Sequence, residues 1–484
     1  MDGAVKLSPV EVDQEIIKWG SAGTQIYKQG NGIDFLNEAN EIAEVDNFEL
    51  YYKRLKKISL LRRLHLEKYD ISKYYMEKID DPYKEQTLRQ NFEDATLEDI
   101  LNNVEGKFNI IRNDYLNGGK QKGDPADGIV ELINDLKASP NIGLPLEGDI
   151  FSYSCRGARL GCFYLKSASS GSGKTRTSVF DACRLAYPIR WSHDEGIFCY
   201  ECNKDGTIRE AEKVLFIVTE MDKEELQTII LAYLSGVNED HILKGHYDTF
   251  GEEHRVRYAA EIIKKYSGYF LIEEISDPNL VNVEATIKRY VTVDGIKYVF
   301  FDYIHSTASM IGQFAKSAVR EDSILMMMAN QLKQIAKDYN IFIFSATQVN
   351  ATAMSDDGEF KNETSIRGAK SISDKSDLSY VMTRVEDKVW NSVKSNLKIA
   401  VREGNLDEKY VNEDDWRPTH IIDIYKMRRG RYKNVRIWIK LDLGTGYRKD
   451  LFMTNPANIV QPVSGKFTYY TLAPVIDWKD DNSD

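Results

Sequence analysis

The sequence feature that most constrains the fold is a run of small residues and glycines that ends in a lysine and a threonine. It spans residues 168–175 and reads Ala-Ser-Ser-Gly-Ser-Gly-Lys-Thr. The β-prone segment CFYLKS precedes it, and the helix-prone segment TRTSVFDACRLA follows. In this context, small residues let successive backbone N–H groups surround phosphate oxygens, and the positive end of the next helix faces the same anion. The pattern therefore predicts a phosphate-binding loop (P-loop) between a buried strand and a helix.

Individual positions of this loop carry more specific predictions. Lys174 would reach the β and γ phosphates of a bound nucleotide, and the Thr175 hydroxyl would bind Mg²⁺. The strict motif begins with glycine, whereas this chain has Ala168 there, so a simple Gly/Ser-rich turn remains the alternative. The predicted nucleotide-binding residues are Ala168, Ser169, Ser170, Gly171, Ser172, Gly173, Lys174 and Thr175.

The remainder of the chain predicts an α/β protein with a mostly parallel sheet. Its 484 residues are 42% hydrophobic, which is enough for one large α/β domain and a smaller appendage. Short, strongly apolar runs separated by helical stretches are typical of a parallel sheet that is covered on both faces. The predicted strands are 162–167, 214–218, 298–302, 341–347, 378–382, 420–425 and 435–441. The helical stretch ILMMMANQLKQIAKDY between two of them spaces its apolar residues as a core face would.

Composition shifts suggest four segments along the chain. Residues 1–117 have helical periodicity and predict a small all-helical domain. Residues 118–147 hold the linker-like run GGKQKGDPADG, followed by a short helix with an apolar face that would need a docking surface. Residues 148–465 form the α/β domain, and 466–484 are predicted as a C-terminal tail.

Charge and cysteine content narrow the class of protein. The net charge of -11 argues against a chain that coats nucleic acid over its whole surface, so any DNA site must be local. Five cysteines and an acidic start without a long apolar stretch favour the cytoplasm over secretion or membrane insertion. One CxxC pair, Cys199 and Cys202 with His193 nearby, offers too few ligands for zinc, and we interpret it as a β-turn.

Polar residues end three other predicted strands. Asp302 stops the run YVFF and is a candidate second Mg²⁺ carboxylate. Glu220 ends the strand expected beside the P-loop strand, where it could accept a proton from water. Gln348 ends a third strand, where its amide could contact the γ-phosphate or the water around Mg²⁺. The alternatives are a turn aspartate, a surface glutamate and an ordinary loop glutamine.

In chain order, the strand ends ASSGSGKT, VTEM, FFDYIH and SATQVN resemble those of the DnaB-type replicative helicases, which are hexameric RecA-like motors. The resemblance covers roughly residues 148–450 and extends more weakly over 47–147. It implies a RecA-like P-loop ATPase fold. It also implies that Glu220 activates the attacking water and that Asp302 assists Mg²⁺.

Two basic stretches extend the resemblance. Residues 366–377 look like the loop that lines the family's central pore and holds single-stranded DNA, with Arg367 at the family's arginine and Gly368 and Lys370 departing from its usual pattern. In KMRRGR, Lys426 and Arg428 match the cations that reach the neighbouring subunit's γ-phosphate. Basic surface loops are the alternative for both stretches.

Taken together, the resemblance implies an ATP-dependent replicative DNA helicase that encircles single-stranded DNA as a homohexamer. It uses ATP and Mg²⁺, and it leaves a primase and a helicase loader as candidate partners. Little chain precedes the helical hairpin that resembles the family's N-terminal collar, so we expect a reduced collar and a phage or mobile-element setting. The alternatives are a RecA-like DNA-dependent ATPase of recombination or signalling that separates no strands, and a binding module without turnover.

Overall fold

The computed structural model describes most of the chain, in two compact units, Met1–Glu131 and Leu132–Asp484. Within the described part of the chain, no helix is both long and apolar enough to cross a membrane. The described residues are 8–18, 25, 27–42, 48–79, 81–105, 125–126, 128–138, 141–169, 171–304, 321–349, 359–362, 370–412, 414–463 and 470–475.

Most of the described residues of the first unit are helical, as the sequence predicts. α1 begins after Ser8 because Ser8 and Glu11 form a capping box, and α5 begins after Asp81, whose side chain accepts from the Tyr83 N–H. The helices are α1 (Pro9–Ile17), α3 (Gly32–Ile42), α4 (Phe48–Leu66), α5 (Pro82–Asp94) and one over residues 97–105. Their small core consists of Leu61, Leu64, Ile71, Tyr74 and Ile100.

The short helix predicted after the linker is α7 (Ile129–Ala138), and it carries an apolar face open to solvent. Five apolar side chains on it are between 44% and 61% exposed, so the described part of the chain leaves them largely uncovered. They are Ile129, Val130, Leu132, Ile133 and Leu136.

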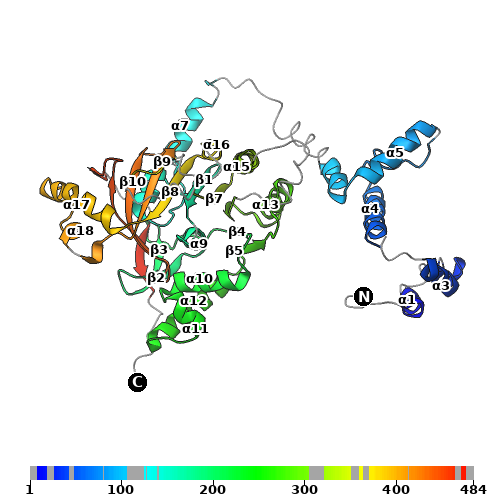
Figure 1. The fold of residues 1–484 in the computed structure, drawn as a ribbon, viewed down its shortest axis with the longest axis horizontal. Coiled ribbons are helices and arrows are strands. Elements are labelled where there is room, and N and C mark those ends of the chain that lie inside the picture. The colour runs from blue at the N-terminus through cyan, green and yellow to red at the C-terminus, as the bar shows by residue number, and fades with distance from the viewer. Residues whose placement is uncertain are drawn as a thin grey trace. The chain divides into compact units, whose positions relative to one another are not determined.

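The second unit is built on a ten-stranded sheet with the order β12-β11-β10-β9-β8-β1-β7-β6-β4-β5 (Figure 1). From β8 to β5 neighbouring strands are parallel, and from β8 to β12 they are antiparallel. The strands are β1 (Phe163–Ala168), β4 (Val214–Val218), β5 (Phe270–Glu274), β6 (Tyr298–Asp302), β7 (Phe342–Gln348), β8 (Leu378–Arg384), β9 (His420–Met427), β10 (Val435–Asp442), β11 (Tyr447–Thr454) and β12 (Val460–Gln461). This confirms all seven predicted strands and adds β5, β11 and β12.

Helices cover both faces of the parallel part because its strands alternate apolar side chains between the two faces. Phe216 and Phe300 pack with α9 (Lys174–Ala186), α10 (Lys223–Ser235) and α12 (Phe250–Lys265). Leu215 and Val299 pack on the other face with α13 (Leu280–Asp294) and α15 (Glu321–Asp338), which confirms the predicted core face of α15. The remaining helices are α8 (Asp149–Cys155), α11 (Glu239–Lys244), α16 (Lys370–Ser373), α17 (Asp387–Arg402), α18 (Lys409–Asn412) and the 3₁₀ helix η5 (Asp414–Trp416).

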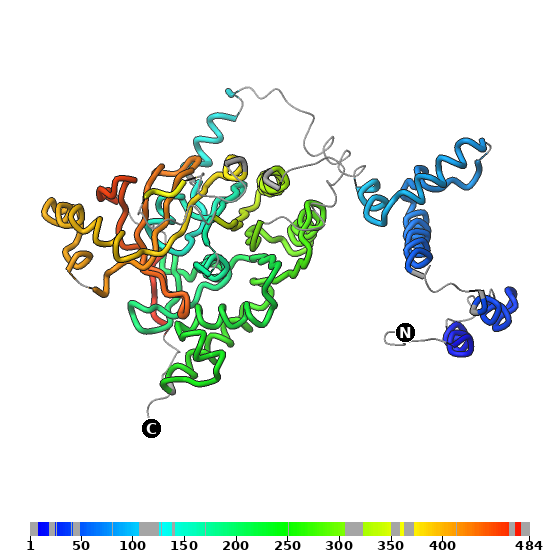
Figure 2. Tube along the Cα trace, in the orientation of Figure 1, coloured from blue at the N-terminus to red at the C-terminus, as the bar shows by residue number. Residues whose placement is uncertain are grey.

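A second, three-stranded sheet corrects two predictions. It consists of β2 (Ile189–Ser192), β3 (Ile197–Cys202) and β13 (Thr471–Pro474), in the order β13-β3-β2. Cys199 and Cys202 lie in strand β3 and not in a turn, because β3 pairs with strands on both sides. Within the segment 466–484, which the sequence predicts as a tail, residues 471–474 form β13 and pair with β3. The tube in Figure 2 shows how distant parts of the chain meet in the two sheets.

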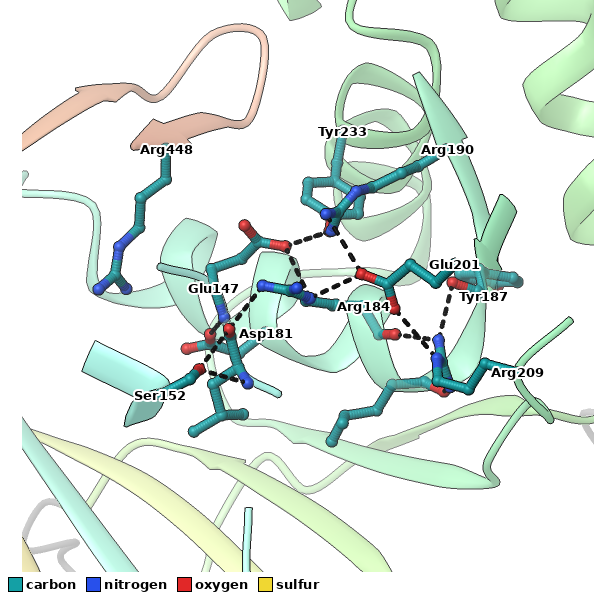
Figure 3. Close-up of polar contacts among 12 residues, drawn as sticks. Glu147, Ser152, Asp181, Arg184, Tyr187, Arg190, Glu201, Arg209, Tyr233 and Arg448 are labelled. Atoms are coloured by element: carbon teal, nitrogen blue, oxygen red, sulfur yellow. Dashed lines mark hydrogen bonds and ion pairs between the residues drawn. The ribbon is translucent and has the colours of Figure 1, made fainter. Parts of the chain in front are cut away.

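A buried group of charged residues ties this small sheet to the helices beside it (Figure 3). Glu201 of β3 accepts from Arg184 at 2.9 Å and from Arg209 at 3.0 Å. Glu147 accepts from Arg190 at 2.6 Å and from Tyr233 at 2.5 Å. Burial alone would raise the pKa of Glu201, but the surrounding guanidinium groups lower it to about 2.

We predict that Glu201→Gln lowers the free energy of unfolding by about 3–5 kcal/mol at neutral pH, because buried guanidinium groups lose their counter-charge. The folded-state pKa of Glu201 lies below its usual value of 4.5. Its stabilisation is therefore present above that value and is lost as the pH falls toward about 2. Denaturant unfolding between neutral and acidic pH measures both effects. The exposed Glu210→Gln is the control, and equal losses in the two variants would contradict the prediction.

Candidate active site

The predicted P-loop connects the end of β1 at Ala168 to the start of α9 at Lys174. Gly171 and Gly173 have φ angles of 72° and 88°, a region that favours glycine. A Cβ atom added to Gly173 would also overlap the Leu443 side chain. Ala168 replaces the usual first glycine without strain, because it is the last residue of an extended strand. Ser170 lies outside the described residues.

Lys174 folds back over the loop. Its ammonium donates to the carbonyl oxygens of Ala168 at 3.2 Å and Ser169 at 3.1 Å. Burial lowers the pKa of Lys174, while the carboxylates of Asp302 and Glu220 oppose that shift. From β8, Arg384 donates to the carbonyl oxygen of Gly171 at 3.3 Å. Two cations are thus bound to backbone carbonyls of the loop.

Thr175 and Asp302 are in direct contact. The Thr175 hydroxyl donates to Asp302 Oδ2 at 2.6 Å, and Asp302 is only 6% exposed. Among the described residues, the other oxygen, Asp302 Oδ1, has no hydrogen-bond partner. Burial raises the pKa of Asp302, and the Thr175 hydrogen bond and the nearby lysines lower it. A hydroxyl oxygen beside a carboxylate with an unpaired oxygen is a donor set that suits Mg²⁺.

Tyr303 connects the other two predicted strand-end residues. Its hydroxyl donates to Glu220 Oε1 at 2.9 Å and accepts from Gln348 Nε2 at 3.3 Å. The Lys174 ammonium lies 5.9 Å from the centre of the Tyr303 ring. In the sequence, Tyr303 directly follows Asp302 in the segment FFDYIH, and that pattern alone gives it no role. Its only signal was its position directly after a strand-end aspartate.

The parallel sheet explains why these residues meet. In the register of the sheet, Ala168 lies opposite Gln348, and Val218 lies opposite Asp302. The carboxyl ends of parallel strands share one edge of a sheet, which is the usual place for ligands in this class of fold. Glu220 follows β4 by two residues and therefore reaches the same edge.

Lys426 and Arg428 lie at the end of β9 and bind a different part of the chain. Lys426 Nζ donates to the carbonyl oxygen of Ser373 at 2.5 Å, and Arg428 Nη2 donates to that of Asp374 at 3.0 Å. Lys426 is half-buried and Arg428 is exposed. Burial lowers the pKa of Lys426 to about 8, and the charge of Arg428 lowers it as well.

The predicted DNA-binding residues fall mostly beyond the described part of the chain. Arg367 and Gly368 lie outside it, and only the backbone of Lys370 is described, at the start of α16. Their contact with DNA stays a prediction.

The chain matches one family model and is similar to a prophage protein and to solved structures. The family model of the DnaB-like helicase C-terminal domain matches residues 162–443. The chain is 31% identical over 466 residues to the SPbeta prophage-derived uncharacterized protein YorI of Bacillus subtilis (strain 168), covering 94% of this chain and 87% of that protein. A solved ATPase domain is 14% identical with a TM-score of 0.50, covering 68% of this chain and 100% of that one. A DnaB-like replicative helicase solved for its interactions with primase is also 14% identical, with a TM-score of 0.47 and coverage of 91% and 90%.

We predict that Gly173→Ala lowers the thermal unfolding midpoint more than Gly171→Ala does. Both substitutions place a side chain at positive φ, at a cost of about 1–2 kcal/mol, but only Gly173→Ala also overlaps Leu443. Adding Leu443→Ala should remove most of the excess in a double-mutant cycle. Equal losses in the two single variants, or no interaction in the cycle, would contradict this.

Proposed function

This chain belongs to the DnaB-like helicase family and is an ATP-dependent DNA helicase, and we propose how its own residues carry out that activity. The family match favours this activity over a recombination or signalling ATPase and over a binding module without turnover. ATP binds at the edge of the sheet where β1, β4, β6 and β7 end. The observation that carries this proposal is the contact between Thr175 and Asp302 beneath the P-loop.

The loop would hold the phosphates with its backbone N–H groups and with Lys174. Without a nucleotide, the Lys174 ammonium donates to two carbonyl oxygens of the loop. When ATP binds, Lys174 would donate to phosphate oxygens instead, because they are stronger acceptors. Thr175 and Asp302 would hold Mg²⁺, which supplies positive charge to the β and γ phosphates when bound. The unpaired Asp302 Oδ1 supports this assignment.

Glu220 is proposed to accept the proton of the attacking water. The Tyr303 hydroxyl donates to one of its carboxylate oxygens and so fixes the direction of the other. Gln348 in turn fixes the Tyr303 hydroxyl. Gln348 is proposed to contact the γ-phosphate, so a change there would alter the orientation of Glu220 through Tyr303. We therefore assign Tyr303 as a positioning residue for the base, Glu220.

Lys426 and Arg428 are proposed to act on the site of a neighbouring subunit in a homohexameric ring. A cation that arrives from a second chain neutralises charge that develops during phosphoryl transfer, and it makes hydrolysis depend on assembly. The exposure of Arg428 supports this role. The open apolar face of α7 supports docking on a second copy of the chain.

Single-stranded DNA would bind in the pore of that ring through residues 366–377, including Arg367, Gly368 and Lys370. Contacts with backbone phosphates carry little sequence preference. The prophage-derived relative supports a phage-type setting. A reduced collar, a primase and a loader are proposals that rest on the resemblance. The boundaries after residues 117 and 147 and a cytoplasmic location are proposals that rest on composition and cysteine content.

We predict that Glu220→Gln and Arg428→Ala each abolish unwinding of a forked duplex with a free 5′ tail, while ATP binding is kept. Mixing the two inactive proteins should restore part of the ATP turnover. A mixed ring contains interfaces in which an intact Glu220 faces an intact Arg428 of the next subunit. Turnover by mixtures, followed with strand separation, measures this.

Matched controls are the exposed neighbours Glu224→Gln and Arg429→Ala, which should unwind like the parent protein. If mixing restores nothing although mixed rings form, Arg428 does not act across the subunit boundary. Turnover without strand separation by the parent protein, under conditions where rings form, would instead favour the ATPase of recombination or signalling.

We predict that Tyr303→Phe lowers kcat for ATP hydrolysis about tenfold with little change in KM, because a hydrogen bond to a carboxylate is worth about 1.5 kcal/mol or more. In a Glu220→Gln background the same substitution should have little further effect, because Tyr303 acts through Glu220. Steady-state kinetics measure both. A rise in KM at constant kcat would assign Tyr303 to nucleotide binding instead.

A further inference from the structure

Lys166 is a lysine inside the buried strand β1, two residues before the P-loop begins. Its side chain is 0% exposed. The ammonium donates to the Lys174 carbonyl oxygen at 3.1 Å, to Thr177 Oγ1 at 2.7 Å and to Ser178 Oγ at 3.0 Å. An ammonium has three donors, and all three are used. A buried charge costs free energy unless it is compensated, so these contacts explain how the strand accommodates a lysine.

The partners of Lys166 all lie in the first turns of α9. It binds the backbone carbonyl of Lys174 directly. It also binds Thr177, whose hydroxyl lies 2.8 Å from the Gly173 carbonyl oxygen. Gly173 and Lys174 belong to the loop that is proposed to bind phosphate. Lys166 therefore connects the central strand to the backbone of the phosphate site from below.

Lys166 also balances buried negative charge. In the part of the chain that the structure describes, Asp302 Oδ1 and Asp181 Oδ2 are buried and have no hydrogen-bond partner. Burial lowers the pKa of Lys166 to about 8, and the charges of Asp181 and Asp302 oppose that shift. The ammonium adds positive charge beneath a loop that already carries the positive end of α9.

We propose that Lys166 is a positioning residue for the triphosphate, which holds the first turn of α9 and places a buried positive charge beneath the P-loop. This inference rests on the proposed nucleotide site. A buried charge acts more strongly on a more highly charged ligand. Lys166 therefore increases the preference of the site for a nucleoside triphosphate over a diphosphate.

The test is the variant Lys166→Met, which keeps the length of the side chain and removes its charge. Calorimetry with Mg²⁺ gives the dissociation constants of a non-hydrolysable ATP analogue and of ADP. We expect affinity for the analogue to fall about tenfold, as expected for the loss of hydrogen bonds from a charged group, and affinity for ADP to fall clearly less. The ratio of the two affinities is the readout that a loss of stability alone would not change.

Two further variants test whether unpaired hydroxyl groups or a general loss of stability could explain the change in the affinity ratio. Lys166→Met combined with Thr177→Val and Ser178→Ala removes the hydroxyl groups that the first variant leaves unpaired, and it should show the same fall in the ratio. Leu397→Ala in α17 is fully buried in a separate core cluster and controls for lost stability. It should leave the ratio unchanged.

The proposal is overturned if Lys166→Met leaves the ratio unchanged, if Leu397→Ala changes it as much, or if the combined variant restores it. Failure of both Lys166 variants to fold would give Lys166 a structural role and would also overturn it. A parent protein that does not bind the ATP analogue would instead contradict the proposed nucleotide site.

Discussion

The hydrogen bond between Thr175 and Asp302 is the interaction on which the rest of the site depends. It joins the first turn of α9 to the end of β6, and β7 lies between β6 and the P-loop strand β1. The contact forms only if three parallel strands keep their register, because a shift of one residue would turn Asp302 to the opposite face. The buried phenylalanines of β6 and β7 that pack with the helices on both faces therefore also set the geometry of the site.

The same contact sets the electrostatics of the site. Asp302 is buried with an unpaired oxygen, an arrangement that is costly unless positive charge lies nearby. Lys166 supplies that charge from inside the sheet and Lys174 from the loop, and both lower the pKa of Asp302 against the effect of burial. Lys166 is completely buried and uses all three of its donors within the fold, whereas Lys174 binds the two carbonyl groups of Ala168 and Ser169, which a phosphate could replace. Lys166 is the fixed cation because it lies inside β1, and Lys174 is the exchangeable one because it lies at the start of α9.

The sequence predicts the parts of the fold and the site that are carried by local patterns. The strand VLFIV is a uniform apolar run, and IFIFSAT begins with four apolar residues. In contrast, β5 reads FLIEE and β11 begins with YRKD, so their charged residues make both strands hard to predict from the sequence. The pairing of Cys199 with Pro474 joins segments that are far apart in the chain, so no local sequence pattern predicts it. Glu220, Asp302 and Gln348 are predictable because they lie at or just after the ends of apolar runs. Lys166 is not, because a lysine in a strand is usually a surface residue.

Lys426 and Arg428, which are proposed to contact a neighbouring subunit's nucleotide, bind the stretch of their own chain that is proposed to hold DNA. In a single chain these cations bind the carbonyl groups of Ser373 and Asp374, which lie within the stretch 366–377 that is proposed to hold DNA. A phosphate on a neighbouring subunit is a stronger acceptor than a neutral carbonyl, so the cations would leave these groups when the neighbour holds ATP. The Ser373 carbonyl would keep its hydrogen bonds from the N–H and hydroxyl groups of Ser376, whereas the Asp374 carbonyl would lose its contact with Arg428. In the proposed ring, the nucleotide of one subunit would thereby change how the DNA-binding stretch of the next subunit is held.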